Sequence, residues 1–282
     1  MPPESRITRF APSPTGPLHL GHAYSALVAA SRGRQGQFLL RIEDIDSARC
    51  KPAFEAQIYD DLRWLGLDWP VPVMRQSDRM PAYRAALQRL ASLGVVYPCQ
   101  CTRGDIRAAL SAPQEGAHVI GPDGLVYPGT CRGRDMAQAG TDDTLRLDMR
   151  RALALTGRVS FVENGPLHGG HHSPDPDEMI ASIGDVVLSR RDMGTSYHLS
   201  VVVDDAAQTI TEVTRGADLF EATAIHALLQ VLLELPRPSY WHHDLIRDEK
   251  GKRLAKRDDA RAIAAYRAAG ASPADIRAML NL

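Results

Sequence analysis

The sequence predicts an α/β fold in which an insertion divides a parallel sheet into two halves and a short α-helical segment follows. Three observations support this prediction. Strand-like and helix-like runs alternate through the first third of the chain, which is typical of parallel βαβ units. The alternation breaks at Tyr97-Pro98, and strand-like runs return only from residue 185. Near the end, residues 262–267 and 273–280 have the composition of two short helices.

The individual elements follow from periodicity and from turn residues. A proline-rich stretch ends a first short strand, and we expect a helix to begin near Pro17. An apolar run typical of a buried strand and two amphipathic stretches typical of helices come next. The last long helix should turn its apolar face to the core. The predicted strands are 7–10, 37–42, 185–189, 199–205 and 209–213, and the predicted helices are 23–32, 54–65, 81–90 and 221–233.

Composition excludes several classes of protein. The chain has 33 basic and 34 acidic side chains, so it has no global field to draw in nucleic acid, and contact with RNA would need a local basic patch. The residues M-P-P-E-S-R at the N-terminus lack an apolar signal core. No window approaches the roughly 18 consecutive apolar residues of a membrane span. We expect a cytoplasmic protein of about two domains, without a membrane partner.

The run R-F-A-P-S-P-T-G-P-L-H-L-G-H at residues 9–22 is the most informative stretch of the sequence. Its prolines stiffen a turn by fixing φ, and Gly16 and Gly21 let the backbone approach a flat ligand closely. His19 and His22 stand three residues apart, so on a helix they share one face at its N-terminal turn, the end that favours anions. Two imidazole donors there would hold phosphate oxygens and stabilise charge on the α-phosphorus of ATP.

This segment resembles the HIGH signature of class I aminoacyl-tRNA synthetases, and R-F-A-P-S-P-T-G resembles their glutamate-specific branch. In that family a second loop, K-M-S-K-S, closes over the ATP phosphates. Residues 251–257, G-K-R-L-A-K-R, are similar to it: Arg253 takes the first lysine position, Ala255 replaces the serine, and Lys256 matches the lysine used on phosphate. The resemblance implies catalytic roles for His19, His22 and Lys256. It also implies a site for ATP with Mg²⁺ formed by His19, Gly21, His22, Arg253 and Lys256.

Recognition of glutamate can be argued from charge. Two carboxylates and one ammonium require two cations and one anion, and Arg9, Arg215 and Glu43 provide that set, although singly each arginine could equally form a surface ion pair. By resemblance to glutamyl-tRNA synthetases, both arginines would clamp a carboxylate, with Arg9 on that of the side chain, and Glu43 would bind the α-ammonium. The implied pocket comprises Arg9, Ala11, Ser13, Glu43, Tyr197 and Arg215. The family's Rossmann-type sheet would bring Arg9, His19, Glu43, Tyr197 and Arg215 together beyond the carboxyl ends of its strands.

The cysteines predict a metal site. Three thiolates could hold zinc if a fourth ligand were supplied, and residue chemistry alone nominates His118. Glutamyl-queuosine synthetases, short relatives of the glutamyl-tRNA synthetases, instead carry C-x-C followed by Y-x-x-x-C, which implies tyrosine. The ligands of one structural Zn²⁺ would then be Cys99, Cys101, Tyr127 and Cys131, although reduced cysteines without a metal remain an alternative. We expect the cluster H-G-G-H-H at 168–172 to form an unliganded loop.

The resemblance also implies a domain organisation. Residues 1–98 and 181–240 would form the two halves of the catalytic domain, 99–180 an acceptor-binding-like insertion, and 241–282 the second loop with two short helices. The residues after Arg257 are too few for an anticodon-binding domain, which needs at least about 50. The sequence therefore resembles the glutamyl-queuosine tRNA(Asp) synthetases.

That family activates L-glutamate to glutamyl-adenylate without tRNA and attaches it to the cyclopentenediol of queuosine in the anticodon loop of tRNA(Asp). We expect the same activity here, in a monomer. Three alternatives stay open: a truncated glutamyl-tRNA synthetase that charges a tRNA 3′ end, glutamylation of a non-RNA acceptor, and an inactive zinc- or RNA-binding paralogue, for which Ala255 is the only hint.

Overall fold

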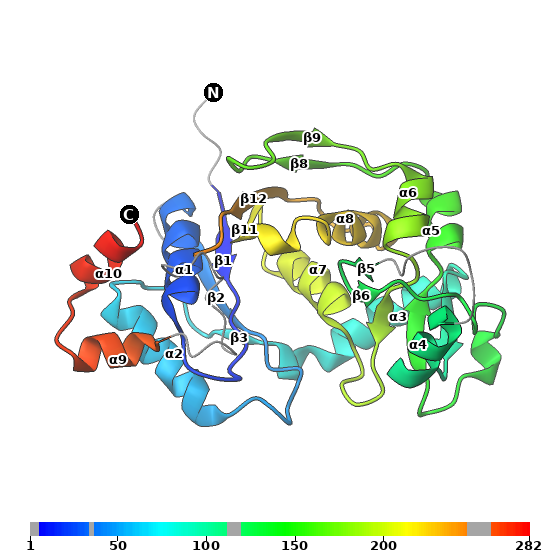
Figure 1. Cartoon of the computed structure of the whole chain (residues 1–282), viewed down its shortest axis with the longest axis horizontal. Helices are drawn as coiled ribbons and strands as arrows, with labels where there is room; N and C mark the ends of the chain where they lie inside the picture. Colours follow the sequence, from blue (N-terminus) through cyan, green and yellow to red (C-terminus); the bar gives the residue numbers. More distant parts are fainter. Residues whose placement is uncertain (1–5, 34–36, 112–119, 247–260) are drawn as a thin grey trace.

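The computed structural model describes residues 6–33, 37–111, 120–246 and 261–282. The molecule is elongated, with the C-terminal helices at one end and a subdomain from the middle of the chain at the other (Figure 1). Within the described ranges, none of the helices is long and apolar enough to cross a membrane.

The first half of the sheet contains three parallel strands, β1 (Thr8–Phe10), β2 (Phe38–Ile42) and β3 (Met74–Arg75). The helices that follow them are α1 (Leu20–Arg32), α2 (Pro52–Trp64) and α3 (Met80–Ser92). The predicted strand–helix alternation is therefore confirmed. The apolar faces of β2, α1 and α2 share one core, in which Leu40, Ile42 and Ile58 are at most 2% exposed.

The second half contains three more parallel strands, β11 (Glu212–Gly216), β12 (Ser239–His243) and β8 (Phe161–Glu163), with β9 (Gly170–His172) antiparallel at the edge. Helices α7 (Tyr197–Ala207) and α8 (Thr223–Leu232) pack beside it. Nearly all of α8 is buried, which confirms that its apolar face belongs to the core.

The two halves meet at β1 and β11. The backbone N–H groups of Thr211 and Glu212 both donate to the carbonyl of Ile7, at 3.0 and 3.2 Å. Placed side by side at this contact, the two sheets give the strand order β3-β2-β1-β11-β12-β8, and the chain runs outward from β1 to β2 on one side and from β11 to β12 on the other. Such a reversal opens a crevice beyond the carboxyl ends of the two central strands, where ligands bind in Rossmann-type sheets.

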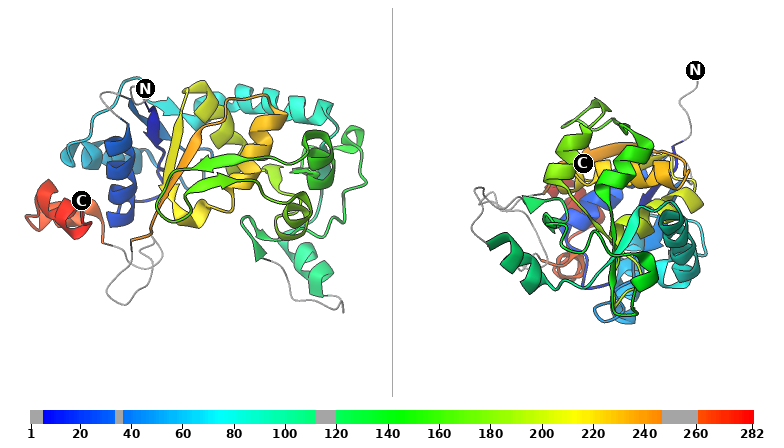
Figure 2. Two further views of the ribbon diagram at one scale, coloured as in Figure 1. Left: turned by 90° about the horizontal axis from the view of Figure 1, so that it is seen from above. Right: turned by 90° about the vertical axis from the view of Figure 1, so that its right-hand side faces the viewer.

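The subdomain lies at the end of the sheet away from the C-terminal helices (Figure 2). Its antiparallel sheet contains β4 (Val96–Cys99), β7 (Thr144–Leu147) and β10 (Val187–Ser189), and a hairpin pairs β5 (Ile120–Gly121) with β6 (Gly124–Leu125). Its helices are α4 (Arg103–Ser111), α5 (Met149–Thr156) and α6 (Pro176–Ser182). β8 falls within the range assigned to the insertion but pairs with β12, whereas β10 follows that range but pairs with β7.

Residues 199–205 do not form the predicted strand, because they lie in helix α7. Ser196 caps this helix by accepting the N–H of Leu199. Leu199, Val201 and Val202 are all buried, and an apolar run buried on every side has no period that tells helix from strand. α1 likewise begins at Leu20, later than expected.

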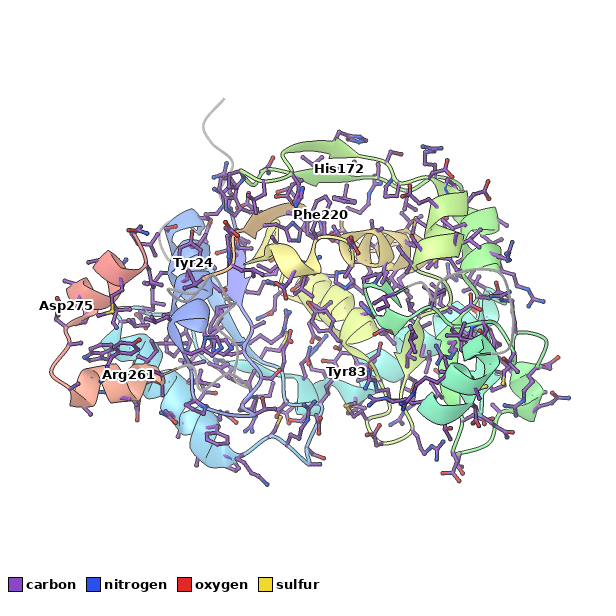
Figure 3. The ribbon with its side chains drawn as sticks, viewed as in Figure 1. Tyr24, Tyr83, His172, Phe220, Arg261 and Asp275 are labelled. Atoms are coloured by element: carbon purple, nitrogen blue, oxygen red, sulfur yellow. The ribbon has the colours of Figure 1, made fainter. Side chains whose placement is uncertain are left out.

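The loop expected at 168–172 contains strand β9, so that prediction is wrong. Pairing with β8 brings the imidazoles of this segment against aromatic rings. His168 stacks on Phe220 with ring centroids 4.0 Å apart. His172, labelled with Phe220 in Figure 3, packs edge-on to the same ring at 5.2 Å. Aromatic packing accounts for these two histidines.

The two short C-terminal helices are confirmed as α9 (Ile263–Ala268) and α10 (Pro273–Met279). Ile263 and Ile276 are fully buried in the core beneath α1 and α2. The N–H of Ile263 donates to the carbonyl of Leu18, just before α1, at 2.8 Å. The C-terminal segment therefore packs directly against residues 9–22, at a point just before helix α1.

Candidate active site

A cavity of about 390 Å³ lies at the point where β1 and β11 meet. It brings together nearly all the described residues that the sequence nominated for the glutamate and ATP sites: Arg9, Ala11, His19, Gly21, His22, Glu43, Tyr197 and Arg215. Ser13 is not part of its lining. Arg253 and Lys256 fall outside the described residues. The predicted convergence of side chains from distant segments is confirmed.

His19 and His22 sit together at the start of α1. His19 has an extended backbone and caps the helix: its Nδ1 accepts the N–H of Gly21 at 3.1 Å, while Nδ1 of His22 accepts the N–H of His19 at 3.2 Å. The two rings lie 3.8 Å apart between centroids. Because each Nδ1 is an acceptor, each neutral ring carries its hydrogen on Nε2. The capping geometry therefore sets the tautomer of both imidazoles.

Arg9 is held by a carboxylate that the sequence analysis missed. Its Nε donates to Oδ1 of Asp205 at 2.9 Å and its Nη2 to Oδ2 at 3.2 Å, and Nη1 of Arg41 donates to the same carboxylate at 2.7 Å. Burial alone would raise the pKa of Asp205, but the two guanidiniums outweigh burial and hold it below its ordinary value. The signal was present as two adjacent aspartates inside an otherwise apolar run, V-V-V-D-D.

The neighbouring Asp204 is equally well satisfied. It accepts hydrogen bonds from Gln76, Arg79 and the hydroxyl of Tyr83, at 2.9, 2.7 and 2.7 Å. Burial and the bond to this carboxylate raise the pKa of Tyr83. This buried network ties α7 to α3 and to residues 76–79 through Asp204, which is next in the chain to the Asp205 that binds Arg9.

Glu43 is one of two carboxylates in the lining of the cavity, the other being Asp218. Its Oε1 accepts from Nη2 of Arg41 at 3.3 Å, and its N–H donates to the carbonyl of Pro12 at 3.0 Å. Burial raises the pKa of Glu43, and the attraction of Arg41 and Arg9 only partly opposes that effect. A cation placed in the cavity would favour the ionised form of this carboxyl.

Arg215 has a different environment. It donates four hydrogen bonds, to Nε2 of His242 (3.0 Å), Nδ1 of His226 (2.9 Å), the hydroxyl of Thr223 (2.8 Å) and the carbonyl of Leu219 (3.1 Å). No carboxylate oxygen of the described residues lies within 4.0 Å of it, although the residue is only 6% exposed. A buried cation without a counter-ion is costly, so this guanidinium is suited to an anionic ligand.

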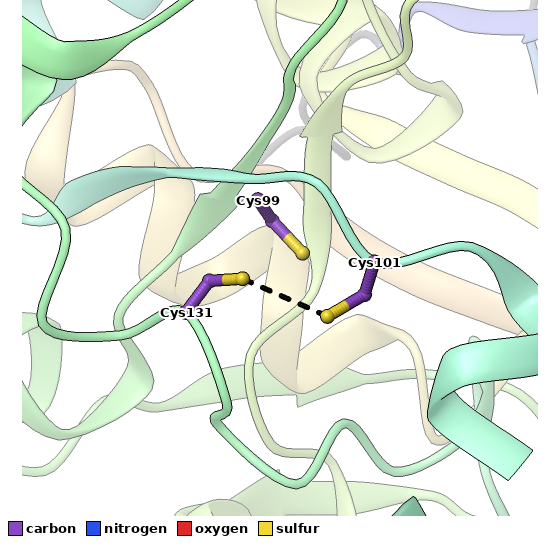
Figure 4. A group of neighbouring side chains, drawn as sticks. All are labelled: Cys99, Cys101 and Cys131. Atoms are coloured by element: carbon purple, nitrogen blue, oxygen red, sulfur yellow. Dashed lines mark hydrogen bonds between the residues drawn. The ribbon is translucent and has the colours of Figure 1, made fainter. Parts of the chain in front are cut away.

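The three predicted thiols form a cluster at the start of the subdomain. The Sγ atoms of Cys99, Cys101 and Cys131 all lie within 4.8 Å of one another, and Cys101 and Cys131 are 3.6 Å apart (Figure 4). The Tyr127 hydroxyl lies 3.3 Å from the sulfurs of Cys99 and Cys101. Zinc with Zn–S bonds of about 2.3 Å separates tetrahedral sulfurs by about 3.8 Å, so this set of atoms has the right spacing. His118 falls outside the described residues.

Burial favours the neutral thiol of Cys131. Hydrogen bonds from the hydroxyl of Tyr127 and the N–H of Gln100 outweigh burial, and they lower the pKa of this thiol to about 7. The thiolate is the form that binds metal. The cluster therefore suits a cation both by the lowered pKa of Cys131 and by the spacing of its sulfurs.

A second cavity, of about 720 Å³, borders this cluster and includes Cys101 and Tyr127 in its lining. Its charged lining is mostly basic: Arg103, Arg107, Arg146, Arg190 and Arg191, against Asp123, Asp185 and Asp192. Arg146 is 8% exposed and stacks over the ring of Tyr127 at 4.0 Å, and its buried Nε has no hydrogen-bond partner. This is the local basic surface that a nearly neutral chain would need for contact with RNA.

Comparison with known proteins agrees with this geometry. The profile of the family described as "tRNA synthetases class I (E and Q), catalytic domain" matches residues 6–282. The sheet topology, the paired imidazoles and this match place the chain in that family of ligases: it belongs to the class I tRNA synthetases of the E and Q group.

Within the family, the chain is similar to proteins named "Glutamyl-Q tRNA(Asp) synthetase". The one from Rhodobacter capsulatus is 62% identical, with 98% of this chain and 100% of the relative covered. The one from Nocardia farcinica is 42% identical, with 97% and 83% covered. The crystal structure of a glutamate tRNA ligase from Elizabethkingia meningosepticum, in complex with its amino acid, has a TM-score of 0.74 at 27% identity, and this chain covers 60% of its length.

Proposed function

We propose that this protein activates L-glutamate with Mg-ATP, without tRNA, and transfers it to the cyclopentenediol of queuosine in the anticodon loop of tRNA(Asp). The observation that carries the proposal is the composition of one cavity: two arginines, two carboxylates (Glu43 and Asp218) and a pair of imidazoles at a helix start. This is the charge pattern that glutamate and a nucleotide phosphate require. The names of the relatives support the choice of acceptor.

The chemistry assigned to each residue follows from its position. Arg215 and Arg9 hold the two carboxylates of glutamate, and Glu43 holds the ammonium. A carboxylate oxygen attacks the α-phosphorus in line, the bond to pyrophosphate breaks, and the Nε2–H groups of His19 and His22 stabilise the developing charge. Arg253 and Lys256 are proposed for the leaving phosphates, and Mg²⁺ arrives with ATP. A ring hydroxyl of queuosine then attacks the mixed anhydride and AMP leaves.

We assign one structural Zn²⁺ to Cys99, Cys101, Tyr127 and Cys131. The spacing of the sulfurs, the adjacent hydroxyl and the lowered pKa of Cys131 support this assignment. The metal would tie strand β4 to the segment around Tyr127. Protein purified without added metal should contain about one zinc per chain, and Cys131→Ser should lose it; a zinc content near zero in the unmodified protein would refute the assignment.

The basic cavity beside the cluster supports an RNA acceptor. Its arginines lie on the subdomain, and Asp123, Val187 and Arg190 line both this cavity and a small one that reaches Tyr197 and Leu219 at the glutamate site. A phosphate backbone lying along this path would bring a nucleotide to the activated amino acid. A queuosine-bearing anticodon loop is the acceptor we propose for that path.

Two assays test the function in order. Glutamate-dependent ATP–pyrophosphate exchange without RNA should be positive, and its absence would favour an inactive paralogue. Labelled glutamate should then transfer to tRNA(Asp) that bears queuosine but not to the same tRNA without it. Labelling that persists without queuosine supports charging of a 3′ end and overturns our choice of acceptor. Exchange without labelling of either RNA points to a non-RNA acceptor.

A further inference from the structure

The hydrogen bonds around Arg215 define the protonation state of its neighbours. A guanidinium only donates, so the ring nitrogens that it touches must be acceptors. Nε2 of His242 and Nδ1 of His226 are those atoms, at 3.0 and 2.9 Å. Each ring therefore carries its single hydrogen on the opposite nitrogen and is neutral.

Each of these ring N–H groups donates to a group that is a carboxylate or lies next to one. Nδ1–H of His242 donates to Oε2 of Glu163 at 2.5 Å. Nε2–H of His226 donates to Nδ1 of His198 at 3.1 Å, and Nε2 of His198 faces Oδ1 of Asp123, in the turn between β5 and β6, at 3.7 Å. One imidazole therefore separates Glu163 from Arg215, and two imidazoles separate Asp123 from Arg215.

Glu163 is built into its place. It is 2% exposed, and its Oε1 accepts the N–H of Gly165 at 2.7 Å and that of His242 at 2.9 Å. A Cβ on Gly165 would lie 2.4 Å from this carboxylate oxygen and 2.6 Å from the carbonyl oxygen of His242, so only glycine fits there. The carboxylate therefore orients His242 and cannot swing over to Arg215.

We propose that His226 and His242 are positioning residues that hold Arg215 through neutral acceptors, so that its positive charge stays uncancelled for a carboxylate of the substrate. This inference rests on the proposed function, because the substrate anion is taken to be glutamate. The two imidazoles orient the guanidinium of Arg215 without neutralising it. The carboxylates that orient the imidazoles lie one or two rings away from Arg215. Asp123 makes the subdomain part of this arrangement.

The shifts of the imidazoles agree with the geometry. Burial, reinforced by Arg215, lowers the pKa of His226 well below its ordinary value. Burial also lowers the pKa of His242, even though Glu163 pulls in the opposite direction. Both rings are therefore neutral at pH 7, as a donor-only partner demands.

A matched pair of substitutions at His226 distinguishes the hydrogen bond that orients Arg215 from the charge of the acceptor. In asparagine and aspartate, Oδ1 occupies the place of His Nδ1, so both His226→Asn and His226→Asp can accept from Arg215, and they differ only in charge. We expect the glutamate KM in pyrophosphate exchange to stay within about fivefold for His226→Asn and to rise at least about 30-fold for His226→Asp, with the ATP KM unchanged in both. A purely structural role predicts the reverse order, because an ionised acceptor binds arginine more strongly.

Equal glutamate KM values for the two folded variants would overturn the proposal. NMR of nitrogen-labelled histidines in the unmodified protein gives a second measurement that needs neither substrate nor variant. It should show His242 with its hydrogen on Nδ1 and His226 with its hydrogen on Nε2, both neutral at pH 7. A protonated ring at either position would overturn the inference, whereas an unmodified protein silent in exchange would count against the proposed function alone.

Discussion

Two buried arginines line one cavity in opposite electrostatic settings. Arg9 shares a two-pronged ion pair with Asp205, and Arg41 adds a second cation to the same carboxylate. Arg215 contacts only neutral acceptors in the part of the chain that the structure describes. The difference teaches that burial and residue type do not define a ligand-binding cation. Arg9 shares its protein counter-ion with Arg41, whereas Arg215 forms no ion pair with a described residue and keeps its whole charge for a ligand.

The largest expected effect is a loss of stability when the counter-ion of Arg9 is removed. Asp205→Asn leaves Arg9 and Arg41 buried without their common counter-ion, so we expect a loss of about 3–5 kcal/mol in the free energy of unfolding. Urea titration measures this change. The matched control is Asp46→Asn, which removes an ion pair with the exposed Arg49 and should cost less than about 1 kcal/mol. Similar losses for the two variants would contradict the description of Asp205 as a buried structural counter-ion.

Replacing Arg215 should reduce the affinity for glutamate more than it reduces the stability of the fold. Arg215→Gln keeps a hydrogen-bonding side chain but removes the charge, so the apparent affinity for glutamate should fall by about 100-fold, or about 2.7 kcal/mol. The midpoint of thermal unfolding should fall by less than it does for Asp205→Asn, because Arg215→Gln leaves buried acceptors without a donor but breaks no ion pair of the described residues. Exchange kinetics and a melting curve provide both numbers. An unfolded variant, or one that keeps normal glutamate affinity, would show that the charge of Arg215 serves the fold rather than the ligand.

The smallest effect concerns pH. The native pKa of His226 lies below the ordinary 6.5, so between these values the unfolded chain binds a proton that the folded protein does not. Stability should therefore fall on acidification below pH 6.5, by up to about 1.4 kcal/mol per pH unit from this group, and should not change from it above pH 7. Asp205, with a lowered pKa, contributes stability that is lost only below its ordinary 3.8.

Comparison with His226→Asn isolates this contribution. Glu43, whose pKa is raised, works in the opposite direction on acidification, but it is common to both proteins and cancels in the difference. Urea titrations at pH 7, 6 and 5 should show a shallower decline for the variant. Parallel declines would mean that His226 titrates normally in the folded protein.

Much of this protein is determined by local chemistry that the sequence displays. The prolines and paired histidines of residues 9–22 predict a helix start that binds phosphate, and the structure forms that start with His19 as the cap. The cysteines predict a cluster and do converge. Periodicity predicts the strand–helix units of the first third of the chain, because half-buried amphipathic segments repeat with the period of their structure.

Tertiary structure alone decided the type of the segment 199–205 and the roles of the charges. A run buried on all sides has no polar face to mark its period, so α7 could not be told from a strand, and its Asp205 could not be assigned to Arg9. The acceptors of Arg215 come from the segment of residues 219–226, which enters α8, and from His242 on the neighbouring strand β12. Which arginine keeps its charge for a ligand depends on distances between such segments, and these are set only when the sheet and helices pack.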